Sequence, residues 1–233
     1  MIRSSLRDER GLTFPELMVG LLIGLIVLGG IVTMVVQTAK TSGRVSERVA
    51  ADQIARPMVQ RIMDELHSAC ISPGLAPILS GSTDKSISFV YGTGSDVAPT
   101  PTKHTITLDT TAKTLTDTTY PKTGGTAPNW TFSTTPSSTY RILSNAGPIG
   151  GNSQPLFTYH AFSNGSISST PLAVPLSSTD AARTVEVRMN LAVTPRTSAT
   201  SSEAGAPVNI QESALLRFTP ANEDTAQAGL PCT

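Results

Sequence analysis

Charged and aromatic side chains are scarce in this chain, and their scarcity limits the functions to be expected. Charged residues make up 15% of the 233 residues and aromatic residues 5%, both low for a soluble enzyme. The formal net charge at pH 7 is +0, so overall electrostatics give no argument for binding a nucleic acid. Ser and Thr instead crowd the chain after residue 80, which favours a β-rich, uncharged, exported surface.

Cysteine is also scarce: the chain has two, Cys70 and Cys232. Two cysteines are too few for a disulfide scaffold, and no C-x-x-C or Cys/His spacing indicates a zinc site. In an oxidising compartment the pair favours one structural disulfide. The alternative is two unpaired thiols.

Motifs of catalysis are absent from the sequence. His67, His104 and His160 are isolated, without H-x-x-x-H or H-E-x-x-H spacing, and there is no G-x-S-x-G, P-loop or calcium-loop pattern. The histidines are therefore expected to be surface or strand residues. The sequence predicts no enzyme, no catalytic residue, no cofactor and no metal site.

A long apolar run is present near the N-terminus. Leu17 to Val36 is twenty residues long, carries no charge and contains one polar side chain, Thr33. A helix of twenty residues spans roughly 30 Å, the thickness of the hydrocarbon core of a bilayer. The run is too long for a cleavable signal peptide, and no A-x-A cleavage site follows it. It predicts a membrane anchor.

The basic residues that flank this run do not decide its orientation. Three arginines precede it and three basic residues follow it, so the positive-inside count is nearly balanced. They are Arg3, Arg7 and Arg10 on one side and Lys40, Arg44 and Arg48 on the other.

The helix is expected to continue beyond the membrane. From Ser42 to Ala69 apolar residues recur mostly every three or four positions, which indicates one buried face. The expected helix runs from Glu16 to Ala69, about 80 Å at 1.5 Å per residue, and "ISPG" at Ile71 to Gly74 ends it. Pro57 is expected to kink it, because proline removes one backbone donor.

Glu16 is the one ionisable residue between Gly11 and Ala39. A charge inside an apolar membrane segment is costly and usually marks function. The alternative is a carboxylate at headgroup level that begins the helix and meets its positive dipole end. Gly20 and Gly24 form a G-x-x-x-G pattern that permits close approach of a second helix, although membrane helices are rich in glycine generally.

The remainder of the chain carries period-two patterns typical of antiparallel strands with one buried face. The buried face is expected to pack on the amphipathic half of the helix, which gives an α+β fold. Loops rich in Gly, Pro, Ser and Thr are expected between the strands, at 92–102, 121–129, 145–155 and 195–207. The expected strands are 86–92, 104–110, 138–143, 156–162, 184–193 and 212–218.

The N-terminal segment resembles the prepilin peptidase site of type IV pilins and type II secretion pseudopilins. In that family the pattern is close to G-F-T-L-x-E, and here it reads Gly11-Leu12-Thr13-Phe14-Pro15-Glu16. Leu12 and Phe14 are conservative departures, and proline is tolerated in the first helical turn. The combination of this motif, a twenty-residue apolar span and an amphipathic continuation is specific.

The resemblance implies cleavage between Gly11 and Leu12 by a prepilin peptidase and methylation of the new N-terminus at Leu12. It implies a single-pass inner-membrane protein, with its N-terminus cytoplasmic and its head outside, that later joins a filament. In this family the glutamate at the position of Glu16 is thought to neutralise the N-terminus of a neighbouring subunit. The implied divisions are 1–11 leader, 12–37 transmembrane half-helix, 38–70 amphipathic half-helix and 71–233 β-rich head.

The head is similar to those of PilW-like minor pilins and J-type pseudopilins. The similarity lies in "YRILSNAGPI", "PLFTYHAFSNG" and "ARTVEVRMNLAV", which place an aromatic strand before a V-x-V strand. It implies a structural subunit that initiates or caps a type IV pilus-like filament, with other pilin or pseudopilin subunits as partners. The alternatives are a pilus-tip adhesin or DNA-uptake subunit and a membrane-tethered exported enzyme.

With this topology both cysteines lie on the exported side, and we predict a disulfide between Cys70 and Cys232. The crosslink would anchor a polar C-terminal tail and stabilise the head by roughly 4–5 kcal/mol in the chain-entropy model. Intact-mass analysis with thiol alkylation, with and without reductant, tests it. A two-dalton deficit without dimer formation is expected, whereas two alkylated cysteines without reductant contradict the pairing.

Overall fold

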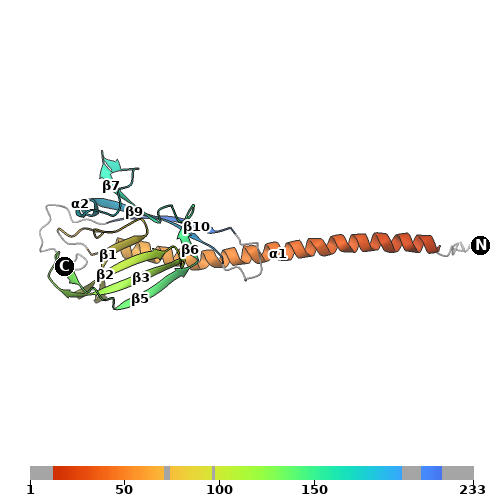
Figure 1. Cartoon of the computed structure of the whole chain (residues 1–233), viewed down its shortest axis with the longest axis horizontal. Coiled ribbons are helices and arrows are strands. Elements are labelled where there is room, and N and C mark those ends of the chain that lie inside the picture. Colours follow the sequence, from red (N-terminus) through yellow and green to blue (C-terminus); the bar gives the residue numbers. More distant parts are fainter. Residues whose placement is uncertain (1–12, 71–73, 96–97, 196–205, 217–233) are drawn as a thin grey trace, which may run out of the picture. The chain divides into compact units, whose positions relative to one another are not determined.

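The computed structural model describes residues 13–70, 74–95, 98–195 and 206–216 (Figure 1). Contacts divide the chain into two compact units, Met1–Ser46 and Glu47–Thr233, which are described separately below. Gly11, Leu12 and Cys232 lie outside the described residues, so the cleavage site and the disulfide remain predictions.

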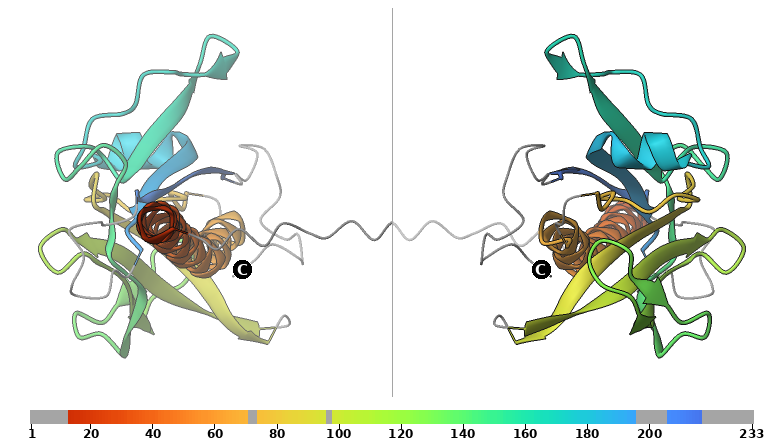
Figure 2. Two further views of the ribbon diagram at one scale, coloured as in Figure 1. Left: turned by 90° about the vertical axis from the view of Figure 1, so that its right-hand side faces the viewer. Right: turned by 90° about the vertical axis from the view of Figure 1, so that its left-hand side faces the viewer.

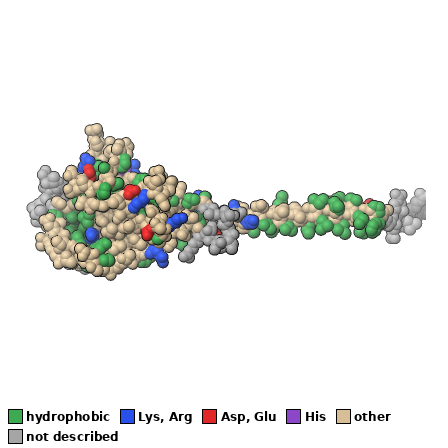
Figure 3. All heavy atoms as spheres, viewed as in Figure 1, with side chains coloured by type: hydrophobic (Ala, Val, Ile, Leu, Met, Phe, Trp, Pro, Cys, Tyr) green, Lys and Arg blue, Asp and Glu red, His purple; other side chains and the backbone are tan. Residues whose placement is uncertain are grey.

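The described part of the first unit is the N-terminal portion of helix α1 (Phe14–His67). Every side chain from Phe14 to Ser46 is exposed, and Figure 3 shows hydrophobic side chains along this stretch. An 18-residue window of the helix has a mean hydropathy of 2.7. Its length and composition fit a membrane span or a signal anchor.

In the second unit one face of α1 is buried. The buried residues of the helix recur at helical spacing and are Ala55, Val59, Ile62, Met63 and Leu66. The helix continues through Pro57. Pro57 has no backbone N–H to donate to the Gln53 carbonyl, and both residues are exposed.

The first sheet is antiparallel, and its strands run in the order β1-β2-β3-β4, with β5 also paired to β3. The face of β1 and β2 opposite Ile87 and Ile106 carries two pairs of partly buried hydroxyl groups: Ser86 bonds Thr107 at 3.1 Å and Ser88 bonds Thr105 at 2.9 Å. These pairs account for part of the Ser and Thr excess. The strands are β1 (Ser86–Ser95), β2 (Ala98–Asp109), β3 (Thr114–Gly124), β4 (Thr131–Phe132) and β5 (Ser138–Ser144).

The second sheet is also antiparallel, in the order β10-β9-β7-β8, with β6 paired to β9. A short helix, α2 (Ser178–Ala182), precedes β9, and the Ser177 side chain caps it by accepting a bond from the Asp180 amide at 3.0 Å. The strands are β6 (Ala146–Pro148), β7 (Phe157–Ser163), β8 (Ser166–Ile167), β9 (Thr184–Val193) and β10 (Val208–Leu215).

One hydrophobic core joins α1 to both sheets, and the two views in Figure 2 show the helix beside them. Phe89 and Ile106 enter it from the first sheet, and Met189 and Leu191 from the second. The Tyr159 hydroxyl of β7 donates to the Thr83 carbonyl just before β1, at 2.8 Å. Burial raises the pKa of Tyr159, so this hydroxyl keeps its proton and its bond.

The expected α+β class, with a long N-terminal helix and antiparallel strands, is confirmed. Each of the six expected strands overlaps an observed one, namely β1, β2, β5, β7, β9 or β10. Reading 121–129 as a loop is wrong at its start, since β3 continues through Gly124. The segments 92–102 and 145–155 are likewise not loops throughout, because β1, β2 and β6 occupy parts of them.

Two isoleucines of α1 give a matched test of the core. Ile62 is 2% exposed and Ile54 is 61% exposed, on the same helix. We expect Ile62→Ala to reduce the free energy of unfolding by about 2–5 kcal/mol, because it leaves a cavity between helix and sheets. Ile54→Ala is expected to change it by less than about 0.5 kcal/mol. Urea unfolding of the full chain in detergent, followed by Trp130 fluorescence, measures both; equal losses contradict the assignment of the core.

Candidate functional site

The first candidate site is the start of α1, where Glu16 stands in the first helical turn. The turn begins directly after Thr13, whose carbonyl accepts the Leu17 amide at 3.1 Å. Glu16 is exposed, as are its apolar neighbours Phe14 and Leu17. The position suits a carboxylate, because unpaired amides give a helix N-terminus a partial positive charge.

Gly20 and Gly24 follow on the same exposed helix. A Cβ atom added at either glycine would meet no heavy atom within 4 Å, apart from the neighbours of the helix itself. Neither glycine is therefore required by packing among the described residues. That a second helix packs closely against Gly20 and Gly24 remains a prediction.

The second candidate site is a cluster of three titratable side chains in the head. Glu65 comes from the end of α1, His104 from β2 and Asp117 from β3. One donor atom from each lies within 4.8 Å of the donor atoms of the other two. His104 Nδ1 lies 3.1 Å from Asp117 Oδ2 and 3.2 Å from Asp117 Oδ1.

The sheet register explains how His104 and Asp117 meet. His104 is paired with Thr119 and Asp117 with Ile106, so the two side chains are diagonal neighbours on one face of adjacent antiparallel strands. Both residues are 7% exposed. They occupy inward positions that hydrophobic residues hold elsewhere in these strands, such as Leu108 and Leu115.

Aromatic rings surround His104 on the β1 side. The Phe89 ring stacks on the imidazole with centroids 5.9 Å apart, and the Tyr91 ring meets it edge to face at 5.8 Å. His104 Nε2 is buried and has no hydrogen-bond partner among the described residues. A buried polar atom without a partner is unusual in a folded protein and requires an explanation.

Glu65 connects this cluster to the surface. Its Oε1 accepts from Arg61 Nε at 2.8 Å, one helical turn earlier, and this bond raises the pKa of the Arg61 guanidinium. Glu65 and Asp117 both line a cavity of about 10 Å³. Glu65 also lines a wider groove of about 520 Å³ together with Asp64 and Tyr91. His104 and Asp117 are buried, and Glu65 is partly exposed.

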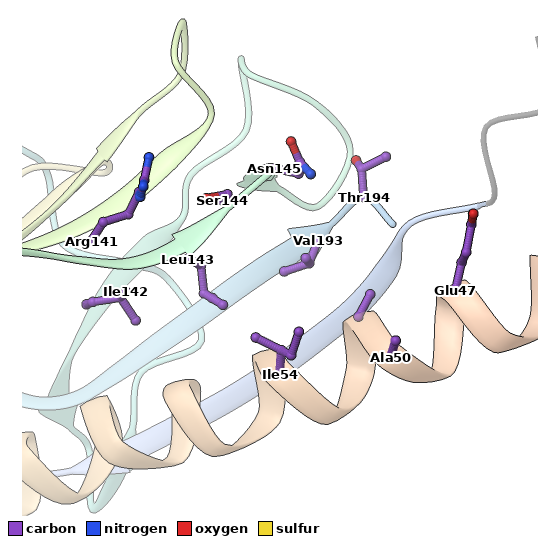
Figure 4. A pocket seen from close by; sticks show the side chains of 11 residues that line it. Glu47, Ala50, Ile54, Arg141, Ile142, Leu143, Ser144, Asn145, Val193 and Thr194 are labelled. Carbon is purple, nitrogen blue, oxygen red and sulfur yellow. The ribbon is translucent and has the colours of Figure 1, made fainter. Parts of the chain in front are cut away.

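An apolar groove of about 350 Å³ lies between the α1 stretch that starts at Glu47 and the ends of β5 and β9 (Figure 4). Ile54 of the helix and Leu143 and Val193 of the strands line it. Its rim carries one acidic residue, Glu47, and one basic residue, Arg141. The groove offers hydrophobic contact and no set of groups for chemistry.

A polar groove of about 670 Å³ crosses the outer face of the second sheet. Glu186 accepts from Arg188 at 2.8 Å, and this hydrogen bond holds the Glu186 carboxyl pKa below its ordinary value despite burial. His160, also in the groove, bonds the Ser168 carbonyl through Nδ1 at 2.8 Å and the Thr158 hydroxyl through Nε2 at 3.2 Å. Because these groups satisfy one another, the groove has no unpaired nucleophile or base among them.

The expectation that the histidines are surface or strand residues is confirmed for His104 in β2 and His160 in β7, and His104 also pairs with Asp117. His104 and His160 are both buried, and His67 ends α1. One sequence feature pointed to His104: it stands two residues before Ile106 and four before Leu108, on the same side of the strand. Asp117 had no such indication, because its strand was not predicted.

Cys70 follows α1 and is 3% exposed, and its amide donates to the Val90 carbonyl of β1 at 2.8 Å. Val90 belongs to the same small cluster of buried residues, and Trp130 packs against it. Cys70 is thus fixed at the junction of helix and first sheet. Its predicted partner, Cys232, lies outside the described residues.

No family model, curated protein or solved structure matches this chain.

Proposed function

We propose that this protein is a minor pilin or pseudopilin, a structural subunit that initiates or caps a type IV pilus-like filament. The observation that carries the proposal is the placement of Glu16. It is a carboxylate in the first turn of an exposed apolar helix, five residues after Gly11, in a motif that resembles a prepilin peptidase cleavage site. In this proposal a prepilin peptidase cuts between Gly11 and Leu12, and the new N-terminus at Leu12 is then methylated.

The energetics of charge in an apolar environment give Glu16 its role. An isolated carboxylate in lipid is costly, and so is the ammonium group at the N-terminus of cleaved Leu12. Placed together, the two charges attract strongly in a low-dielectric environment. A neighbouring subunit in the correct register supplies the ammonium group, so Glu16 selects that register.

The surface of the helix supports assembly as well. All described side chains from Thr13 to Ser46 are exposed, and most of the first part is apolar. Such a surface needs lipid or other helices around it, because exposing it to water costs about 25 cal/mol per Å². In the proposed cycle the inner membrane covers the helix first, and helices of other subunits cover it in the filament. The leader then faces the cytoplasm and the head lies outside.

Co-expression of the chain with a prepilin peptidase tests the processing step. We expect the mass of the protein to fall by that of residues 1–11, and Gly11→Ala to prevent the change by removing the glycine that the peptidase requires. Gly20→Ala is the matched control, since it makes the same substitution at an exposed helical position with free space around it. An unchanged mass in the unmodified chain contradicts the proposal.

Glu16→Ala tests the assembly step. The variant should be cleaved normally, yet its incorporation into sheared filaments should fall about tenfold or more, as expected for losing a close charge pair worth at least about 1.4 kcal/mol. Glu16→Gln should behave like Glu16→Ala, since it keeps the shape but not the charge, and Glu47→Ala serves as a control outside the apolar run. Normal incorporation of Glu16→Ala would show that the charge pair is dispensable.

A further inference from the structure

We propose that Glu65, His104 and Asp117 bind a divalent transition-metal ion, with zinc the expected ion. The site joins the end of α1 to strands β2 and β3 inside the head. This inference does not depend on the filament function, because it uses residues of the second unit only.

The spacing of the donor atoms is close to what a shared ion imposes. Zinc bonds nitrogen and oxygen ligands at about 2.0–2.2 Å, so two ligands of a tetrahedral ion lie about 3.3–3.6 Å apart. His104 Nδ1 and the Asp117 oxygens are 3.1 and 3.2 Å apart. The Glu65 donor is within 4.8 Å of both residues, so a small side-chain adjustment brings it into the same shell.

The contact between His104 Nδ1 and Asp117 depends on which ring nitrogen carries the proton. If Nδ1 carries the proton, it donates to Asp117, and the lone pair of Nε2 is left buried without a donor. In that tautomer Nδ1 cannot also bind the ion, so the shared site requires the other tautomer. If Nε2 carries the proton, the lone pair of Nδ1 faces a carboxylate 3.1 Å away. Two acceptors at that distance repel each other unless a cation lies between them.

The balance of charge points the same way. Glu65 and Asp117 bring two carboxylates to a site that is largely buried, while Arg61 supplies one positive charge through its bond with Glu65. The Arg61 side chain is 59% exposed, so it can turn into solvent at little cost when an ion takes its place. A divalent ion neutralises both carboxylates at once.

The donor set selects the class of ion. One imidazole with two carboxylates suits zinc and neighbouring transition metals better than calcium, which prefers six to eight oxygen ligands. Three protein ligands leave one tetrahedral position for water, and Glu65, one of the three, also lines the groove of about 520 Å³. Because the three ligands come from a helix and two strands, the ion fastens the end of α1 to the first sheet.

The test uses the full chain in detergent, with any histidine tag removed and metals stripped by a chelator. We expect about one equivalent of Zn²⁺ to bind in competition with a chromophoric chelator, and the melting temperature of the head to rise with zinc concentration. Glu65→Gln, His104→Gln and Asp117→Asn should each weaken zinc binding by about 10-fold or more.

Two variants control for zinc binding elsewhere. Asp64→Asn changes the exposed carboxylate next to Glu65 on the same helix. His160→Gln changes another buried histidine, whose two ring nitrogens already have partners. Both should bind zinc like the unmodified chain. Absence of binding by the unmodified chain, or equal binding by Glu65→Gln, overturns the proposal.

X-ray absorption at the zinc edge keeps the test decisive if His104→Gln does not fold. The zinc-loaded unmodified chain should show one imidazole and oxygen ligands only. A spectrum without an imidazole contribution, or one with sulfur ligands from Cys70 or Cys232, overturns the assignment.

Discussion

The burial of one stripe of α1 is the contact on which the head depends. Ala55, Val59, Ile62 and Leu66 follow one another at helical spacing, and each is 2% exposed or less. Both sheets direct hydrophobic side chains into the same core. The helix therefore supplies a shared surface against which both sheets pack.

The N-terminal part of the same helix, in contrast, has no buried face. From Phe14 to Ser46 no described side chain is buried, and the apolar residues lie on all faces instead of one. A helix that is hydrophobic all round requires an apolar environment from outside the chain. The change from an all-round pattern to a single stripe therefore separates a part whose length and composition fit a membrane span from a part that packs on the two sheets.

The regularity of a strand decided how well its residues could be predicted. In β9, Val187, Met189 and Leu191 alternate with polar residues, and that strand was predicted with its observed bounds. In β3 the inward positions hold Leu115 and then Asp117, so the hydrophobic alternation stops after one residue and the strand was missed. The candidate metal site was missed for the same reason, because Asp117 reaches His104 only through the β2–β3 register. The roles of Gly11, Leu12 and Glu16 rest on the sequence motif, since the structure describes only Glu16 among them.

The two proposed sites solve one electrostatic problem in different ways. A carboxylate away from water is costly until a cation compensates it, and a cation held at close range in a low-dielectric environment does so most effectively. Glu65 and Asp117 lie where the fold has already assembled an imidazole beside them, so a small ion is sufficient to complete the site. Glu16 lies on a helix surface with no partner side chain nearby in the described structure. In the proposed filament its cation is the N-terminus of a neighbouring subunit, so Glu16 would act between chains, whereas Glu65 would act within the head.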